Sequence, residues 1–237
     1  PEVISYLILY QKELGVLFLA MRSKNNNFKK NINNFIKLIF FLQTKIRGYF
    51  YKIFIINNSG RNLLIGKNVK ILNGNNLFIG NNCFIDDNSF IDADSKFGVK
   101  IGNNVLINRG SYLKGFGERG GEGIIIKNNV TLGNNSILYG HALLTIGNFC
   151  AIGPNVVCIP ENHNYINSKI LIRKQGTIRK RIFIEDDVWI GSGVKILAGT
   201  TIGKGSVIGA GAVVNNNIPP FCMAAGVPAI IKKKRLR

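Results

Sequence analysis

A period of six residues is the feature of this sequence that most constrains its fold. From Ile184 to Pro219 the chain divides into hexads, each opened by an aliphatic residue, with a usually small residue in fifth place. Amphipathic helices repeat apolar residues every three or four positions and half-buried strands every two, so this period fits neither. It fits a ribbon of short strands and sharp corners, where Gly and Asn reach left-handed backbone angles at low cost. The period predicts a parallel β-helix.

The same period extends back to residue 65, with interruptions at regular places. Before Ile184, hexads open at Ile65, Ile71, Ile79, Ile85, Ile91, Ile101, Ile107, Leu113, Ile126, Leu132, Leu138, Ile146, Ile152 and Cys158. The steps longer than six run from 71 to 79, 91 to 101, 113 to 126, 138 to 146 and 158 to 184, after every third hexad. If three hexads form one turn of a triangular prism, all these insertions leave from one corner. We expect the functional site along that edge, walled by the loops 114–123 and 159–183.

Length and charge predict one elongated domain with two basic appendages. Residues 1–61 form a basic amphipathic helical extension, 62–219 the β-helix, and 220–237 a basic C-terminal tail. The net charge is +19, and residues 1–61 hold 10 basic and 2 acidic groups, 62–168 hold 8 and 7, and 169–237 hold 13 and 3. Basic ends favour anionic partners: a phosphorylated ligand, a membrane surface or nucleic acid. A solvated, solubilising surface is the alternative.

The first 61 residues lie outside the hexad period. The segment 3–20 is apolar, but Lys12 and Glu13 at its middle argue against a spanning helix, so we expect a helix packed on protein. The segment 35–56 mixes aromatic and aliphatic residues with four basic ones, which fits a helix in a membrane interface or an amphipathic helix packed on the core. No signal-peptide pattern stands out. We expect a cytoplasmic protein with peripheral membrane contact through residues 1–61.

The cysteines predict no metal and no disulfide framework. Cys83 and Cys150 are fifth in their hexads and Cys158 is first, which are inward places where a thiol acts as a small apolar residue. Cys222 lies in the C-terminal tail. No CxxC pair or Cys/His cluster has the spacing of metal ligands.

The chain contains two histidines, and both fall near the interrupted corner. His141 is fourth in the eleventh hexad, and His163 follows the start of the fourteenth. They are therefore one coil apart, and neighbouring strands of a sheet are about 4.8 Å apart. We expect the two histidines to belong to one site.

Several motifs of the sequence resemble those of one enzyme family. They are IGNFCAIGPN at 146–155, ENHNY at 161–165, KQG at 174–176, IEDDVWIG at 184–191, IGAGAVV at 208–214 and AGVPA at 225–229. Together they resemble the hexapeptide-repeat acyltransferases, above all the acetyltransferases of surface polysaccharide synthesis and their galactoside and maltose relatives. The resemblance covers residues 62–234. It implies a left-handed β-helix, a homotrimer with active sites between subunits, acetyl-CoA as co-substrate without a metal, and a sugar or glycan acceptor.

The resemblance also implies roles for individual residues. His163 occupies the place of the family's catalytic base, where a neutral imidazole takes the proton of a sugar hydroxyl as its oxygen attacks the thioester. Apart from the resemblance, Glu161 lies close enough in sequence to orient that imidazole, or is a solvated loop carboxylate. His141, one coil away and without the family's loop motif, is expected to hydrogen-bond the acceptor, and Tyr165 to contact it. Trp189 points outward, which suits a subunit interface or a cofactor cleft. The residues expected to bind the cofactor are Ser192, Gly193, Ala210, Gly211 and Lys233.

The sequence therefore predicts transfer of an acetyl group from acetyl-CoA to a hydroxyl of a sugar or of a cell-surface polysaccharide precursor. Two alternatives remain: N-acetylation of an amino sugar, and a non-catalytic β-helix that serves as a membrane or nucleic-acid scaffold. Between the two scaffold partners we favour the membrane. A γ-class carbonic anhydrase shares the coil but needs three histidines, and this chain has two. The acceptor is not spelled out by the loops, because loops of very different composition can bind the same sugar.

Overall fold

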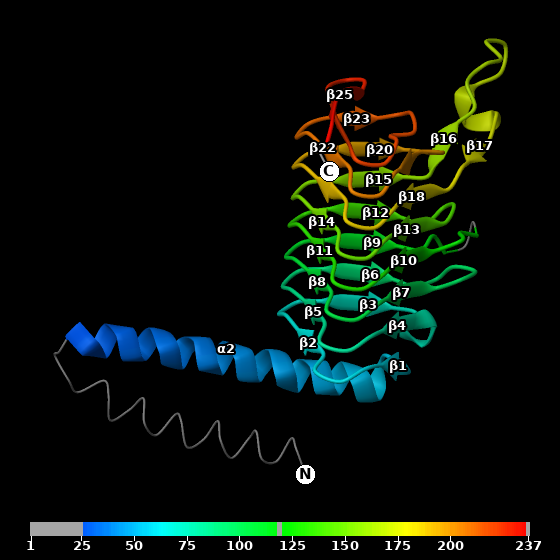
Figure 1. Ribbon diagram of the computed structural model, residues 1–237. Coiled ribbons are helices and arrows are strands. Elements are labelled where there is room, and N and C mark those ends of the chain that lie inside the picture. Colours follow the sequence, from blue (N-terminus) through cyan, green and yellow to red (C-terminus); the bar gives the residue numbers. More distant parts are fainter. Residues whose placement is uncertain (1–25, 118–119, 236–237) are drawn as a thin grey trace.

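A long helix and a coil of short parallel strands form this protein (Figure 1), which is described here from a computed structural model over residues 26–117 and 120–235. The helix is α2 (Asn26–Phe54). Sheet A contains β1 (Asn58–Ser59), β4 (Leu77–Ile79), β7 (Val99–Ile101), β10 (Ile124–Ile126), β13 (Leu144–Ile146), β18 (Ile182–Ile184) and β21 (Thr201–Ile202).

Two further sheets complete the coil. Sheet B contains β2 (Leu64–Ile65), β5 (Phe84–Ile85), β8 (Leu106–Ile107), β11 (Thr131–Leu132), β14 (Ala151–Ile152), β19 (Trp189–Ile190), β22 (Val207–Ile208), β24 (Cys222–Ala225) and β25 (Ile230–Lys234). Sheet C contains β3 (Lys70–Leu72), β6 (Phe90–Asp92), β9 (Tyr112–Lys114), β12 (Ile137–Tyr139), β15 (Val157–Ile159), β20 (Lys195–Leu197) and β23 (Val213–Val214). The chain visits A, B and C in turn, and we name its corners AB, BC and CA.

The strand register confirms the hexad period. In sheet B, Ile65 lies opposite Ile85, and Ile85 opposite Ile107, so residues that open hexads stack on one another. Of the hexad-opening residues all but Ile71 are buried, and Ile71 is partly buried against the same core. The three-sheet parallel coil is consistent with the left-handed β-helix that the resemblance implies. The predicted fold class is confirmed.

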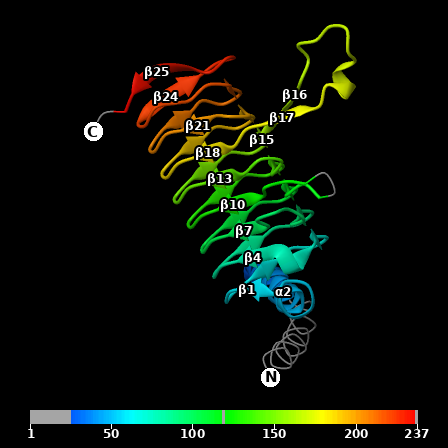
Figure 2. The same ribbon diagram turned by 90° about the vertical axis from the view of Figure 1, so that its right-hand side faces the viewer.

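The interruptions also lie where the period places them. Each of the longer connections, 73–76, 93–98, 115–123, 140–143 and 160–181, joins a strand of sheet C to the next strand of sheet A. The CA corner therefore holds all of these insertions. The longest one carries a hairpin of β16 (Glu161–His163) and β17 (Thr177–Arg179), which projects away from the coil (Figure 2).

Asparagine side chains support the AB corner. Asn62, Asn82 and Asn104 have φ between 55° and 57°, in the left-handed region that Asn tolerates better than most residues. Their amides form a ladder: Asn62 Nδ2 donates to Asn82 Oδ1 over 3.0 Å, and Asn82 Nδ2 donates to Asn104 Oδ1 over 3.1 Å. The same residue thus turns the backbone and bonds one coil to the next.

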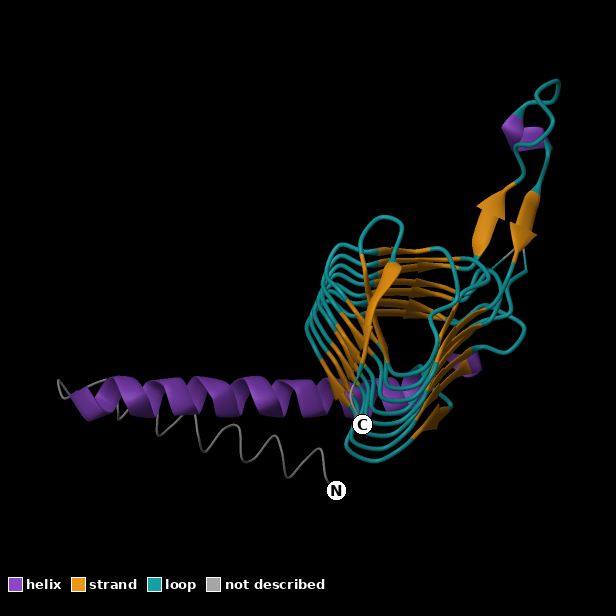
Figure 3. Ribbon diagram, turned by 45° about the horizontal axis from the view of Figure 1, so that its top comes forward, coloured by secondary structure: helices purple, strands orange, loops and turns teal. Residues whose placement is uncertain are grey.

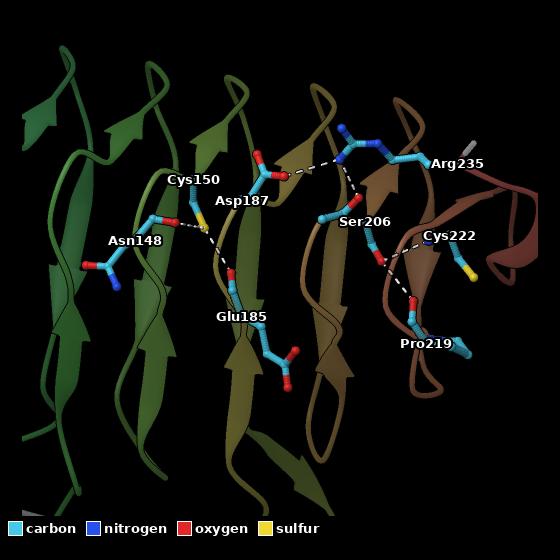
Figure 4. Close-up of polar contacts among 9 residues, drawn as sticks. Asn148, Cys150, Glu185, Asp187, Ser206, Pro219, Cys222 and Arg235 are labelled. Atoms are coloured by element: carbon cyan, nitrogen blue, oxygen red, sulfur yellow. Dashed lines mark hydrogen bonds and ion pairs between the residues drawn. The ribbon is translucent and has the colours of Figure 1, made fainter. Parts of the chain in front are cut away.

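The interior is apolar, and the four cysteines are part of it. Cys83, Cys150, Cys158 and Cys222 are all buried and unpaired. The inward positions predicted for the first three are confirmed. The Cys150 thiol donates to the Glu185 carbonyl over 3.1 Å (Figure 4), and burial raises the pKa of that thiol to about 11.

The helix α2 closes the N-terminal end of the coil. Arg47 Nε donates to the Ile65 carbonyl over 2.9 Å, and the Tyr51 hydroxyl donates to the Val69 carbonyl over 2.6 Å. Gly48 allows this approach, since a Cβ there would lie 2.0 Å from the Leu63 carbonyl oxygen. The predicted helix at 35–56 is present as the greater part of α2, whereas the segment 3–20 lies outside the described residues.

At the other end, β24 and β25 prolong sheet B beyond residue 219. β24 runs parallel to β22, and β25 folds back antiparallel to β24. Arg235 Nη1 fastens this end to the coil through the Gly205 carbonyl, at 2.6 Å, and Asp187, at 3.4 Å (Figure 4). Among residues 26–117 and 120–235, no helix is both long and apolar enough to span a bilayer.

Candidate functional site

Two insertions of the CA corner meet beside the coil. Arg181 in the hairpin binds Glu122 in the loop 115–123, with Nε to Oε2 at 2.7 Å and Nη2 to Oε1 at 3.0 Å. Glu122 Oε2 also accepts from the Leu143 amide over 2.9 Å. Between them lies a cavity of about 420 Å³ lined by Lys96, Gly120, Gly121, Glu122, His141, Ala142, Arg179 and Arg181. The predicted site edge therefore has walls from the two loops that the sequence singled out.

His141 lies in this cavity, in the connection 140–143, with a side chain only 10% exposed. Its Nε2 is 3.5 Å from Glu161 Oε1, and Glu161 Oε2 accepts from Arg179 Nε over 2.6 Å. The imidazole stacks on Phe116, with ring centroids 3.2 Å apart, and meets Tyr139 edge-on. Its Nδ1 is buried and has no hydrogen-bond partner among residues 26–117 and 120–235. A ligand hydroxyl or amine would satisfy that nitrogen, because buried polar atoms are rarely left unpaired.

The surroundings keep the His141 imidazole neutral. The pKa of His141 is lowered from its usual 6.5 to about 4, chiefly by burial; Glu161 opposes this shift, and Arg179 and Lys114 contribute to it. Burial raises the pKa of Glu161, but the hydrogen bond from Arg179 and the proximity of His141 hold that pKa below its usual value. At neutral pH the pair is thus a neutral imidazole beside a carboxylate, suited to hydrogen bonding.

His163 is placed differently. It ends β16, opposite Thr177 on β17, and its side chain is exposed on the projecting hairpin. Tyr165 follows it and is 72% exposed. Glu161 was predicted to orient His163, but its carboxylate contacts His141, Arg179 and Thr177. Within one chain the structure therefore gathers His141 and Glu161 in the cavity and leaves His163 and Tyr165 open to solvent.

The residues expected to bind the cofactor lie at the BC corner. Ser192 and Gly193 turn the chain between β19 and β20, and Ala210 and Gly211 do so one coil later. The two turns stack, because the Gly211 amide donates to the Ser192 carbonyl over 2.8 Å. A Cβ on Gly211 would meet nothing within 4 Å, so a ligand could approach the turn closely.

Two more predicted residues face outward from sheet B. Trp189 on β19 is 59% exposed, as the hexad position predicts. Lys233 lies on β25, opposite Met223, and its side chain is exposed. Both belong to the sheet that leads into the BC corner, whereas the histidines belong to the CA corner, so sheet C separates the two groups within one chain.

Several residues of the site have no individual signal in the sequence. Glu122, Arg179 and Arg181 line the cavity, and the rings of Phe116 and Tyr139 contact the His141 imidazole. The ion pair of Arg181 with Glu122 joins positions 59 residues apart, and no period links them. The one available signal was the meeting of two long insertions at one corner.

No group of three or more His, Cys, Asp or Glu with a metal-binding arrangement occurs in the described ranges. The candidate site combines a neutral imidazole, a carboxylate and a guanidinium at one corner with an open turn of small residues at the next.

Comparison with known proteins matches the repeat and the fold. The family described as bacterial transferase hexapeptide (six repeats) matches residues 181–216, and the hexapeptide repeat of succinyl-transferase matches 76–114 and 116–139. No curated protein sequence matches the chain. The coil, its register and these repeats make the chain a hexapeptide-repeat protein.

Solved structures of the N-acyltransferase AntD from Bacillus cereus have a similar fold. A variant in complex with dTDP-4-amino-4,6-dideoxyglucose and coenzyme A is 20% identical with a TM-score of 0.56, and covers 80% of this chain and 89% of its own. The complex with dTDP and 3-hydroxybutyryl-CoA is 20% identical with a TM-score of 0.56, and covers 80% and 88%. At this identity the likeness concerns the fold.

Proposed function

We propose that this protein transfers an acetyl group from acetyl-CoA to a hydroxyl of a sugar or of a surface-polysaccharide precursor. The observation that supports this most is the cavity at the CA corner, where a buried neutral imidazole has an unpartnered nitrogen. The repeat is described as one of bacterial transferases, and the AntD structures of similar fold hold coenzyme A and a nucleotide-sugar. A sugar acceptor and a CoA donor therefore suit this fold and this corner.

In the proposed mechanism His163 is the general base. Its exposed imidazole, in the neutral form, takes the hydroxyl proton as the acceptor oxygen attacks the thioester carbonyl. The sulfur leaves as coenzyme A thiol after the tetrahedral intermediate collapses, and the proton held by His163 returns to it. The hairpin position, matched to the family motif around 161–165, is the support for this role.

His141 positions the acceptor in this proposal. Because the pKa of His141 is about 4, its ring is neutral near pH 7. It is then too weak a base to compete with His163 for the hydroxyl proton. With Nε2 next to Glu161, its Nδ1 is the atom that can accept a hydrogen bond from a sugar hydroxyl. Tyr165, on the hairpin, would contact the same acceptor.

The cofactor binds at the BC corner. The small residues Ser192, Gly193, Ala210 and Gly211 let the pantetheine arm approach the backbone, Trp189 borders the cleft, and Lys233 faces the phosphates. Since sheet C separates this corner from His163 in one chain, we propose a homotrimer in which one subunit supplies the hairpin and its neighbour the BC corner. A monomer in sedimentation experiments that keeps full activity would contradict this arrangement.

The first experiment incubates the protein with acetyl-CoA and a panel of nucleotide-sugars and oligosaccharides, with mass spectrometry of the products. With an accepted sugar in hand, His163→Ala should lower kcat by about 10²–10⁴-fold and leave acetyl-CoA binding unchanged. His141→Ala should instead raise the KM for the acceptor by roughly 2- to 10-fold, the value of one hydrogen bond. The matched control is Asn162→Ala, which truncates an exposed residue next to His163 on β16.

The outcome that would reverse the roles is loss of turnover in His141→Ala with a mere change of acceptor KM in His163→Ala. A product in which nitrogen carries the acetyl group would favour the second candidate, N-acetylation of an amino sugar, which the fold shared with AntD keeps open. Neutralising Lys232, Lys233 and Lys234 to Gln should raise the KM for acetyl-CoA without changing that for the sugar.

A further inference from the structure

The helix α2 and the first coil form the most one-sidedly charged part of the molecule. Between Leu14 and Ile85 the sequence contains no acidic residue and 11 basic ones. Much of α2 extends sideways beyond the coil (Figures 1 and 3). This end has no part in the proposed acyl transfer, whose residues lie at later coils.

One face of α2 exposes large apolar side chains. Ile36, Phe40, Tyr49, Phe50, Ile53 and Phe54 are 56%, 41%, 38%, 52%, 53% and 70% exposed. At 3.6 residues per turn they lie within about 180° of one another around the helix axis, and Lys45 and Lys52 follow at one edge of that half. Soluble monomers rarely expose an apolar strip of this kind unless something binds it.

A basic pocket lies where α2 meets the first coil. The cavity, of about 260 Å³, is lined by Lys45, Gly48, Tyr49, Lys52, Gly60, Arg61, Asn62 and Leu63. Three of these residues are cationic and none is acidic. Lys52 Nζ donates to the Gly60 carbonyl over 3.3 Å, which fixes its ammonium group at the pocket. Such a pocket attracts a phosphate, because its lining carries three cationic side chains and no acidic one.

We propose that α2 docks this protein on an anionic membrane, with its exposed aromatic face in the interface and a phospholipid headgroup in the pocket of Lys45, Lys52 and Arg61. Helices of this kind, with basic residues at the edge of an aromatic face, lie in the plane of the bilayer surface. Anionic lipid attracts the lysines and arginine, and the apolar face is removed from water. Nucleic acid would satisfy the cations but would leave Ile36 and Phe54 exposed.

The test measures co-sedimentation of the full-length chain with vesicles. Vesicles of phosphatidylcholine with 30% phosphatidylglycerol should bind the protein, and pure phosphatidylcholine vesicles should bind it at least about tenfold more weakly, because attraction to several basic residues is lost. Lys45→Gln, Lys52→Gln and Arg61→Gln combined should weaken binding to the anionic vesicles about as much. Phe40→Ser, Phe50→Ser and Phe54→Ser combined should weaken binding even at low salt, where the charges alone act most strongly.

The matched control changes the same charge elsewhere: Lys169→Gln, Arg173→Gln and Lys174→Gln on the projecting hairpin. Full vesicle binding by this control, with loss in the pocket variant, supports the proposal. Equal loss in both, or equal binding to neutral and anionic vesicles, overturns it. So does a change of oligomeric state in the Phe variant without loss of vesicle binding, which would mean that a second copy covers the face. If the Phe variant fails to fold, the charge variants decide alone.

Failure of this proposal is distinct from failure of acyl transfer. Acetyl transfer to a soluble acceptor should be unchanged in the pocket variant, since none of its three substitutions touches the CA or BC corner. A pocket variant that loses vesicle binding and keeps transferase activity supports both proposals at once.

Discussion

The CA and BC corners join sheet C to its two neighbouring sheets, yet they differ in how much additional chain they accommodate. At the BC corner successive turns stack on each other, and at Gly191 a Cβ would lie 2.6 Å from the Ala210 amide nitrogen. At the CA corner the connections range from a few residues to the hairpin-bearing 160–181. The BC corner therefore holds successive coils together, whereas the CA corner accommodates the insertions that form the candidate site.

The BC and CA corners also differ in their polar contacts. At the BC corner the backbone of one turn bonds the next, as between Gly211 and Ser192, and side chains at equivalent places in successive turns also bond, as Asn68 with Asn88. At the CA corner they are side-chain ion pairs between distant insertions, such as Arg181 with Glu122. Stacked backbone turns repeat from coil to coil, whereas each ion pair is specific to its own loop.

The strongest test of the comparison inserts one residue at each corner. An Ala placed between Gly153 and Pro154 should lower the free energy of unfolding by about 3 kcal/mol or more, because the corner has no room for it. Already a Cβ on Gly133 would lie 2.4 Å from the Pro154 nitrogen. An Ala placed between Ser168 and Lys169, in the hairpin, should change that free energy by less than about 0.6 kcal/mol. Chemical denaturation followed by circular dichroism measures both, and equal losses would refute the comparison.

A smaller change asks the same question without altering the chain length. Gly191→Ala should cost about 2 kcal/mol, because its methyl group meets backbone atoms of Ala210 and Ile208 that cannot move freely. Gly176→Ala, in the hairpin, has φ of 75° but open space around its Cβ, so its cost is about 1 kcal/mol of local backbone strain. Midpoints of urea unfolding should therefore shift more for Gly191→Ala. The reverse order would mean that the hairpin, and not the BC corner, limits stability.

The pH dependence of stability sharpens the account of the CA corner. In the folded chain the pKa of His141 is about 4, compared with a usual value of 6.5. Between these two pH values the unfolded chain therefore binds a proton at this residue and the folded chain does not. The free energy of unfolding should therefore fall as pH drops from 6.5 to 5, with a slope of up to about 1.4 kcal/mol per unit. His141→Gln should flatten this slope. A slope that survives in His141→Gln would show that another group titrates there.

The smallest expected effect concerns the end of the coil. Arg235 bonds Gly205 and Asp187, but both charged side chains are about half exposed, so Arg235→Ala should cost at most about 1 kcal/mol. Arg109→Ala, which breaks the exposed pair with Asp87, is the matched control inside the coil. Thermal unfolding should show similar small shifts for the two. A loss of several degrees in Arg235→Ala alone would mean that β25 is needed to close sheet B.

Most of the fold could be predicted from the sequence, and part of the site. The inward place of Cys158, the outward place of Trp189 and the single loop-bearing corner all follow from counting in sixes. That the two histidines belong to one site stays a prediction, since His141 lines the cavity and His163 is exposed on the hairpin. The partner of Glu161 could not be predicted. The sequence suggested that its carboxylate orients His163, whereas in the structure this carboxylate contacts His141.

The sequence by itself determined the coil, because a hexad period fixes for every residue whether it faces the core, the solvent or a corner. This rule is local and is the same in every coil, so each further coil supports the same prediction. Only the tertiary structure decided how the insertions meet. The pairs of Arg181 with Glu122 and of Arg179 with Glu161, and the basic pocket between α2 and the first coil, depend on segments that no period relates. Their positions are set by packing and charge across space, which the order of residues along the chain does not reveal.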